Sequence, residues 1–128
     1  MPADGGFHPL SPSRVVDTRL APLSAVVRGG VLDVSLLGRG GVPLSGVSAV
    51  VLNVTAVDGV SLGYVSVWPG GESRPRASSV NFGAGQPVAN VVVAKLGAGG
   101  VVSFWNADDS LLMGSVNLLV DVVGWFAS

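Results

Sequence analysis

The sequence predicts an all-β protein, a single compact β-sandwich of the jelly-roll kind. Of its 128 residues, 48% are hydrophobic, only 12% are charged, and 19 are glycine. An ordinary soluble domain carries about 25% charged residues, so this chain has an unusually apolar character. The apolar residues form short, valine-rich runs that end at Gly, Pro, Asn or Asp, which is typical of strands joined by turns. Helical spacing of apolar residues is not sustained over any useful length.

About eight segments carry a strand pattern. Most alternate apolar and polar residues, which is typical of a strand with one face on the core. Two of them, Val47–Val57 and Val116–Phe126, are nearly all apolar and are expected to be covered on both faces. We expect the sixth and seventh segments to form a hairpin across Gly97–Gly100. In chain order the predicted strands are Arg14–Thr18, Val31–Leu37, Val47–Val57, Tyr64–Trp68, Ser78–Phe82, Val88–Leu96, Val101–Asn106 and Val116–Phe126.

The length predicts one domain, since 128 residues can enclose one hydrophobic core. Residues 1–13 are predicted to be an N-terminal segment, and residues 14–128 the single β domain. The first residues, from Met1 to Gly6, lack the basic and apolar stretches of a signal peptide. No uncharged apolar stretch is long enough to span a bilayer, so we expect no membrane insertion.

An internal repeat supports a second architecture. Gly63–Trp68 and Gly100–Trp105 share the pattern Gly-x-Val-Ser-x-Trp, and a Ser-Val-Asn follows each, at Ser79–Asn81 and Ser115–Asn117. A weaker third copy begins at Gly30. Three such units would make a pseudo-threefold fold, a β-trefoil or a β-prism, and this alternative stays open beside the sandwich.

The chain is poor in groups that carry chemistry, and we expect no enzymatic activity. His8 is the single histidine and cysteine is absent. There is no Gly-x-Ser-x-Gly turn for a nucleophilic serine and no Gly-Lys-Ser/Thr of a phosphate loop. Asp108 and Asp109 are adjacent acids, which form ordinary turns more often than calcium sites. We therefore predict no catalytic residue, no metal and no cofactor. The lack of a long basic run argues against nucleic-acid binding.

Polar residues inside the apolar strands are predicted to form a structural network. Arg14, Asp17 and Arg19 lie together at the first strand, and Asp121, in an otherwise apolar strand, is the expected partner of one arginine. An anion-binding role for the arginines is the alternative. Buried amides need hydrogen-bond partners, and a satisfied network helps to fix strand register. The amides assigned to this network are Asn53, Asn81 and Asn90.

Three aromatic residues, Tyr64, Trp68 and Trp105, are the candidate contact residues. Alternate side chains of a strand share a face, so Tyr64 and Trp68 lie on one face while Val65 and Val67 take the other. If the valine face forms the core, the aromatic side chains point outward. There they would anchor a protein partner or stack on a sugar. The alternative is that loops cover them as a second small core.

Landmarks along almost the whole chain resemble a small all-β domain of bacterial, chiefly actinobacterial, surface proteins. The segment Pro12–Arg19 matches that family's opening, Pro-x-Arg-x-x-Asp-Thr-Arg. The domain also resembles accessory domains of phage virions. The resemblance implies a non-catalytic β-domain displayed outward, which we expect here to stand alone. The later landmarks are Gly41–Pro43, Ala49–Thr55, Gly63–Gly71, Ser79–Phe82, Ala89–Asn90 and Val120–Phe126.

Two functional hypotheses follow. The first is a structural protein of a surface assembly, most concretely an oligomeric virion decoration or tail-appendage component. Its partners would be its own copies or a larger protein lattice, because an apolar, weakly charged surface suits burial between subunits. The second is a module that binds a cell-wall or other cell-surface carbohydrate. The expected location is accordingly the virion surface, the cell surface or the extracellular space.

Overall fold

The computed structural model of the protein describes residues 6–107 and 114–128. Those residues contain eight β-strands and one short 3₁₀ helix, and no α-helix. The predicted all-β fold is confirmed. Asp108 and Asp109 lie outside the described residues, as do residues 1–5. The elements are β1 (Phe7–Asp17), β2 (Val31–Ser35), β3 (Val47–Val57), β4 (Gly63–Pro69), β5 (Val80–Phe82), β6 (Val88–Lys95), η1 (Ala98–Gly100), β7 (Val101–Asn106) and β8 (Asn117–Ala127).

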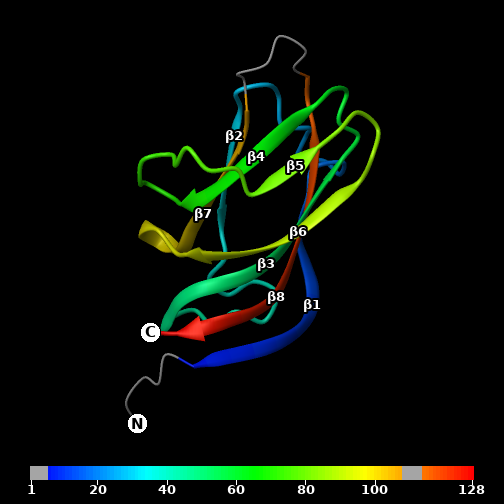
Figure 1. Cartoon of the computed structure of the whole chain (residues 1–128). Coiled ribbons are helices and arrows are strands. Elements are labelled where there is room, and N and C mark those ends of the chain that lie inside the picture. The colour runs from blue at the N-terminus through cyan, green and yellow to red at the C-terminus, as the bar shows by residue number, and fades with distance from the viewer. Residues whose placement is uncertain (1–5, 108–113) are drawn as a thin grey trace.

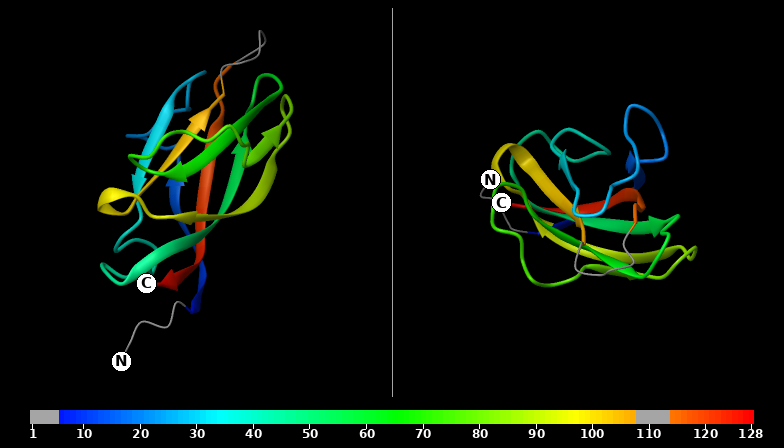
Figure 2. Two further views of the ribbon diagram at one scale, coloured as in Figure 1. Left: turned by 60° about the vertical axis from the view of Figure 1, so that its left-hand side comes forward. Right: turned by 90° about the horizontal axis from the view of Figure 1, so that it is seen from above.

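The strands form two antiparallel sheets that pack face to face (Figures 1 and 2). One sheet has the order β1-β8-β3-β6 and the other the order β2-β7-β4-β5. The first strand pairs with the last, the second with the second last, and so on inward. The pairs are β1 with β8, β2 with β7, β3 with β6, and β4 with β5. A long hairpin rolled into two sheets gives this order, which is that of a jelly roll. The trefoil or prism alternative is therefore wrong.

The Gly-x-Val-Ser-x-Trp repeat marks neighbouring strands of one sheet. β4 and β7 are antiparallel partners, with Ser66 opposite Trp105 and Trp68 opposite Ser103. β2, which contains the weaker third copy, pairs with the other side of β7. The similarity therefore reflects a shared environment, with valines toward the core and Ser and Trp on the other face.

One predicted boundary, at the start of the domain, and one predicted strand pairing are wrong. β1 begins at Phe7, so residues 7–13 belong to the sandwich and not to a separate N-terminal segment. Pro9 and Pro12 hide this strand in the sequence, but both lie in an edge strand, where a missing N–H is tolerated. The expected hairpin of β6 and β7 does not form. β6 pairs with β3, and the Gly97–Gly100 segment crosses from one sheet to the other.

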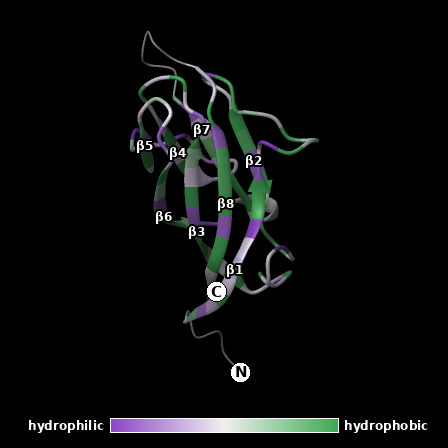
Figure 3. Ribbon diagram, turned by 90° about the vertical axis from the view of Figure 1, so that its right-hand side faces the viewer, coloured by the Kyte–Doolittle hydropathy of each residue, from purple (hydrophilic) through white to green (hydrophobic). Residues whose placement is uncertain are grey.

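The main core lies between the sheets. Alternate residues of the central strands β3, β8 and β7 point into it and are fully buried, and Phe104 is the largest of these side chains. Figure 3 shows hydrophobic residues along most of β8. The outer-face residues of β3 and β8 are buried or half-buried, which agrees with the nearly continuous apolar sequences of these two strands.

Candidate functional site: an open sheet edge and its groove

The three candidate contact residues lie together: Trp68 and Trp105 are buried beneath a loop, and Tyr64 is half-buried beside them. Trp68 and Trp105 are only 9% and 5% exposed, and with Ala107 they form a cluster separate from the main core. Tyr64 packs against this cluster, edge-on to Trp105 at 5.9 Å between ring centroids. The prediction that these aromatic side chains point into solvent is therefore wrong for Trp68 and Trp105, whereas Tyr64 is half-buried. The alternative, a second small core under a loop, is confirmed.

Residues 70–79, between β4 and β5, form the cover. Trp68 Nε1 donates a hydrogen bond to the Glu72 carbonyl at 3.0 Å. The guanidinium carbon of Arg74 lies 3.6 Å from the ring centroid of Trp105, a cation–π contact. The outer face of β4 and β7 is thus occupied by the protein's own chain.

The predicted ion pairing is present. Arg14 binds Asp121 across β1 and β8 with two hydrogen bonds, of 2.8 and 3.3 Å. A second pair joins Asp17 and Arg19, with two side-chain bonds of 2.9 Å. The hydrogen bonds from Arg19 lower the pKa of the Asp17 carboxyl below its ordinary value. Both arginine side chains are exposed, so solvent screens these pairs.

The predicted amides do not complete one network with these charges. Asn53 is half-buried and lies opposite Asp121 in the β3–β8 ladder. Asn81 and Asn90 are exposed, on β5 and β6. Asn90 donates from Nδ2 to the Ser79 carbonyl at 2.8 Å and so joins β6 to the segment before β5. The residues assigned to the predicted polar network therefore make separate local contacts, and these hydrogen bonds do not join them all.

Two buried polar residues, Thr18 and Asn106, have no place in the predicted network. Thr18 Oγ1 donates to Asn117 Oδ1 at 2.7 Å and accepts the Leu118 N–H at 2.8 Å. Asn117 Nδ2 in turn donates to Asp58 at 3.0 Å. Asn106 Nδ2 donates to two backbone carbonyls at 3.0 Å each. The sequence held one signal for each of these residues. Thr18 is the threonine of the Asp-Thr-Arg motif, and Asn106 is an amide at the end of an apolar strand.

Replacing Thr18 with valine is expected to lower the free energy of unfolding by about 1–3 kcal/mol, because the Leu118 N–H would lose its acceptor in a buried place. Urea unfolding followed by circular dichroism measures the loss. Thr55→Val is the matched control, since Thr55 lies on the outer face of β3 and is only half-buried. Equal losses in the two variants would contradict the structural role given to Thr18.

Three of the four sheet edges carry features that hinder pairing with another strand. β1 contains two prolines and two shifts of register. β5 has only three residues. β2 has five residues and places the charged Asp33 at its centre. Proline, irregular register, short length and charge are the usual means by which proteins keep edge strands from associating.

β6 is the exception. It has eight residues, no proline and no shift of register against β3, and its one charge, Lys95, is at its last position. Val91 and Val93 are 60% and 62% exposed. Among the residues that the structure describes, no backbone hydrogen bond joins β6 to a strand other than β3. β6 is therefore an open, apolar edge, at the margin of its sheet in Figure 1.

A groove of about 320 Å³ runs beside the end of β6. Its β6 side consists of Val93, Ala94 and Lys95. The opposite side is built by the end of β4 and the covering loop, and consists of Val67, Trp68, Pro69, Glu72, Ser73 and Pro75. The open edge thus adjoins a space lined by apolar rings, with one acidic and one basic side chain at its margins.

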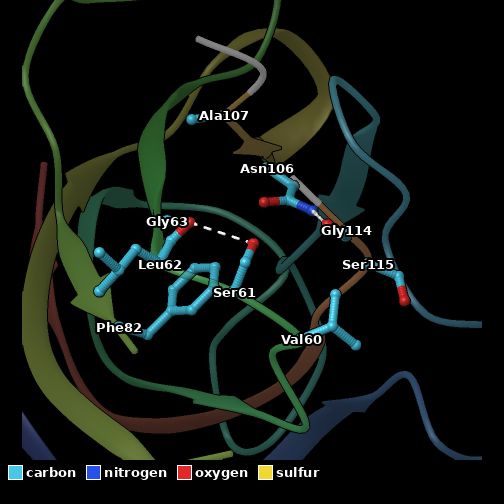
Figure 4. A pocket seen from close by; sticks show the side chains of 9 residues that line it. All are labelled: Val60, Ser61, Leu62, Gly63, Phe82, Asn106, Ala107, Gly114 and Ser115. Atoms are coloured by element: carbon cyan, nitrogen blue, oxygen red, sulfur yellow. Dashed lines mark hydrogen bonds between the residues drawn. The ribbon is translucent and has the colours of Figure 1, made fainter. Parts of the chain in front are cut away.

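Two further hollows are poorer candidates. The first, at one end of the sandwich (Figure 4), has Val60, Leu62 and Phe82 among its lining residues and leaves no room for a water molecule. The second, of about 310 Å³, lies between β2 and the preceding loop and is lined by residues 22–27 and 30–32, none of them charged. Neither hollow brings charged side chains together.

Within residues 6–107 and 114–128, no three His, Cys, Asp or Glu side chains are grouped so as to hold a metal ion. The same residues include no helix with the length and apolar character needed to cross a membrane. A scan against models of protein families found no match, and searches of curated proteins and of solved structures found none either.

Proposed function

We propose that this protein is a non-catalytic structural component that assembles through its surface, as an oligomer or on a larger protein lattice. Its most concrete form is a virion decoration or tail-appendage protein displayed outward. The observation that carries the proposal is the open β6 edge. A sandwich that protects three edges and leaves one long, apolar edge unprotected is suited to controlled association.

Composition and packing support assembly over carbohydrate binding. The chain has 12% charged residues and keeps exposed valines on β6, as expected for a surface that becomes covered. Jelly rolls occur both in viral capsid proteins and in lectins, so the fold by itself favours neither. A sugar platform needs accessible aromatic faces, whereas Trp68 and Trp105 lie under the covering loop.

Carbohydrate binding stays as the second candidate because of the groove. There Trp68 lines the groove together with Glu72, Ser73 and Lys95, which offers hydrogen-bonding groups beside an aromatic residue. Retention of the protein on purified peptidoglycan, with loss of retention in Glu72→Ala but not in Arg28→Ala, would favour this candidate. Arg28 is exposed and does not line the groove.

Sedimentation velocity over a wide range of protein concentration tests the proposed assembly. We expect a defined species heavier than the 12.8 kDa chain, because the exposed apolar edge gains by being covered. A protein that sediments as a single chain at every concentration, and does not co-sediment with isolated virion or surface-layer lattices, would contradict the proposal. The specific oligomer should keep the β-sheet circular dichroism spectrum of the folded protein. That spectrum distinguishes it from a disordered aggregate of unfolded chains.

A further inference from the structure

We infer that β6 is the contact strand of this assembly and that it pairs with β6 of a second copy, antiparallel about a twofold axis at Val93. The inference rests on the proposed function and names the surface and the occupant. The pairing would join two four-stranded sheets edge to edge into one continuous sheet.

The backbone of β6 has hydrogen-bonding groups available on its open side. In an antiparallel ladder, successive residues direct their N–H and C=O groups alternately to one neighbour and to the other. Leu96, directly after β6, donates its N–H to β3 at 3.2 Å, so even-numbered residues face β3. The N–H of Val91 is instead accepted by Asn90 Oδ1 at 3.0 Å. By this alternation, the N–H and C=O groups of Val93 and Lys95 point away from β3.

The same contacts place the axis at Val93. Asn90 occupies the Val91 N–H and holds the first half of β6 to the Ser79 carbonyl, so the second half is the free part. With the axis at Val93, the two Val93 residues exchange N–H to C=O hydrogen bonds in both directions. Lys95 then donates its N–H to the carbonyl of Val91 of the second copy. The Asn90 contacts are left intact in both copies.

The side chains of β6 favour a second copy as the occupant. On the outer face, the pairing places Val93 beside Val93 of the second copy, and Val91 beside the aliphatic stem of Lys95. Apolar cross-strand pairs of this kind stabilise antiparallel sheets. Lys95 is the single charge of β6, and it lies opposite a valine and not opposite its own copy. The net charge of −1 per chain adds little repulsion between two copies.

The groove gives the second strand a place to lie. The segment from Val91 to Val93 of the second copy would run beside Val93–Lys95, along the wall that Pro69 and Pro75 provide. These proline rings and Trp68, which also lines the groove, would cover the apolar side chains of the incoming strand. The groove and the free backbone groups thus coincide along the same half of β6.

The other edge of the sheet limits the assembly to two copies at this contact. A twofold contact uses the same strand from both partners and leaves β1 at each outer margin. β1 carries Pro9 and Pro12, and the Arg39 guanidinium donates a hydrogen bond to the carbonyl of Val15. Because that edge is protected, edge pairing closes at a dimer and does not continue into a fibre.

The variant Val93→Lys tests the contact, because it places two positive charges side by side at the axis. We expect the wild-type chain to sediment as a dimer and Val93→Lys as a monomer at the same concentrations. Val31→Lys is the matched control: it makes the same change at a 53% exposed valine on the β2 edge, and it should stay dimeric. By hydrogen exchange, the Val93 and Lys95 amides should become protected as wild-type concentration rises, but not in Val93→Lys.

Each remaining outcome has a definite meaning. An oligomer that both Val93→Lys and Val91→Lys leave intact would overturn the β6 contact while the proposed assembly stands. Val91→Lys faces Lys95 of the second copy, so it also decides the matter if Val93→Lys does not fold. A wild-type monomer whose β6 amides become protected only when another protein is added would overturn the second copy as occupant. A monomer that joins nothing would contradict both proposals.

Discussion

Replacing Phe104 with alanine is expected to lower the free energy of unfolding by about 3–5 kcal/mol. Phe104, on β7, is the largest of the fully buried side chains in the main core. Its removal withdraws an aromatic ring from between the two sheets and leaves a cavity that rigid strands on both sides cannot close. Domains of this size are stable by about 5–15 kcal/mol, so the loss is a large part of the total.

Urea unfolding of the variant and the wild type measures this effect, and Phe7→Ala is the matched control. Phe7 is an exposed phenylalanine at the start of β1, in contact with Phe126. It undergoes the same change of side chain outside the main core, and we expect a clearly smaller loss. If the two variants lost equal stability, the central place of Phe104 between the sheets would be wrong.

The second large effect is expected for Gly97→Ala, at the crossing from β6 to β7. A Cβ atom at Gly97 would lie 1.9 Å from the carbonyl oxygen of Gly70, and near that residue's N and C atoms. The obstacle is backbone, which cannot rotate aside as a side chain could. Gly70 also donates its N–H to the Val101 carbonyl at 2.8 Å. Moving Gly70 away from Gly97 would therefore break this hydrogen bond, which joins the end of β4 to the start of β7. We expect a loss of about 3 kcal/mol or more, the upper range for overpacking.

Gly83→Ala is the control for this variant. A Cβ atom at Gly83 would have only Leu62 as a neighbour, at 3.8 Å, an ordinary contact. Thermal unfolding of the two variants beside the wild type should show a large decrease in Tm for Gly97→Ala and little change for Gly83→Ala. A Gly97→Ala protein as stable as the wild type would mean that the two segments do not cross as closely as described.

Local patterns were enough to predict most of the strands. Val47–Val57 and Val101–Asn106 have the same bounds in the sequence and in the structure. These segments are rich in residues that favour strands, and turn-forming residues flank them. The start of β1 was missed because Pro9 and Pro12 read as turn residues, and proline is compatible with a strand only at an edge. Whether a strand lies at an edge depends on which other strands pair beside it.

The pairing of strands was beyond local patterns. The glycines of Gly97–Gly100 suit a tight hairpin, but they also suit a close crossing between sheets, and the alternation of β6 and β7 is the same in both cases. The choice depends on β3, which pairs with β6 although residues 58–87 lie between the two strands in the sequence. The sequence similarity of β4 and β7 likewise has its cause in their pairing within one sheet.

The candidate site shows the same division. Alternation correctly places Tyr64 and Trp68 on one face of their strand, opposite the valines, and Arg14 does pair with Asp121. What covers that face was decided by residues 70–79, whose path follows from tertiary contacts such as those of Trp68 and Arg74. The open edge of β6 could not be recognised from its sequence, because an apolar strand reads alike at the margin and in the middle of a sheet.

The order of polar and apolar residues, a short-range property, by itself determined that this chain is a β-sandwich with little charge and about where its strands lie. The partners of each strand, the burial of Trp68 and Trp105, and the exposure of Val91 and Val93 were decided only when distant segments met. The physical reason is that backbone conformation responds to neighbouring residues, whereas burial and free hydrogen-bonding groups depend on which segment packs alongside.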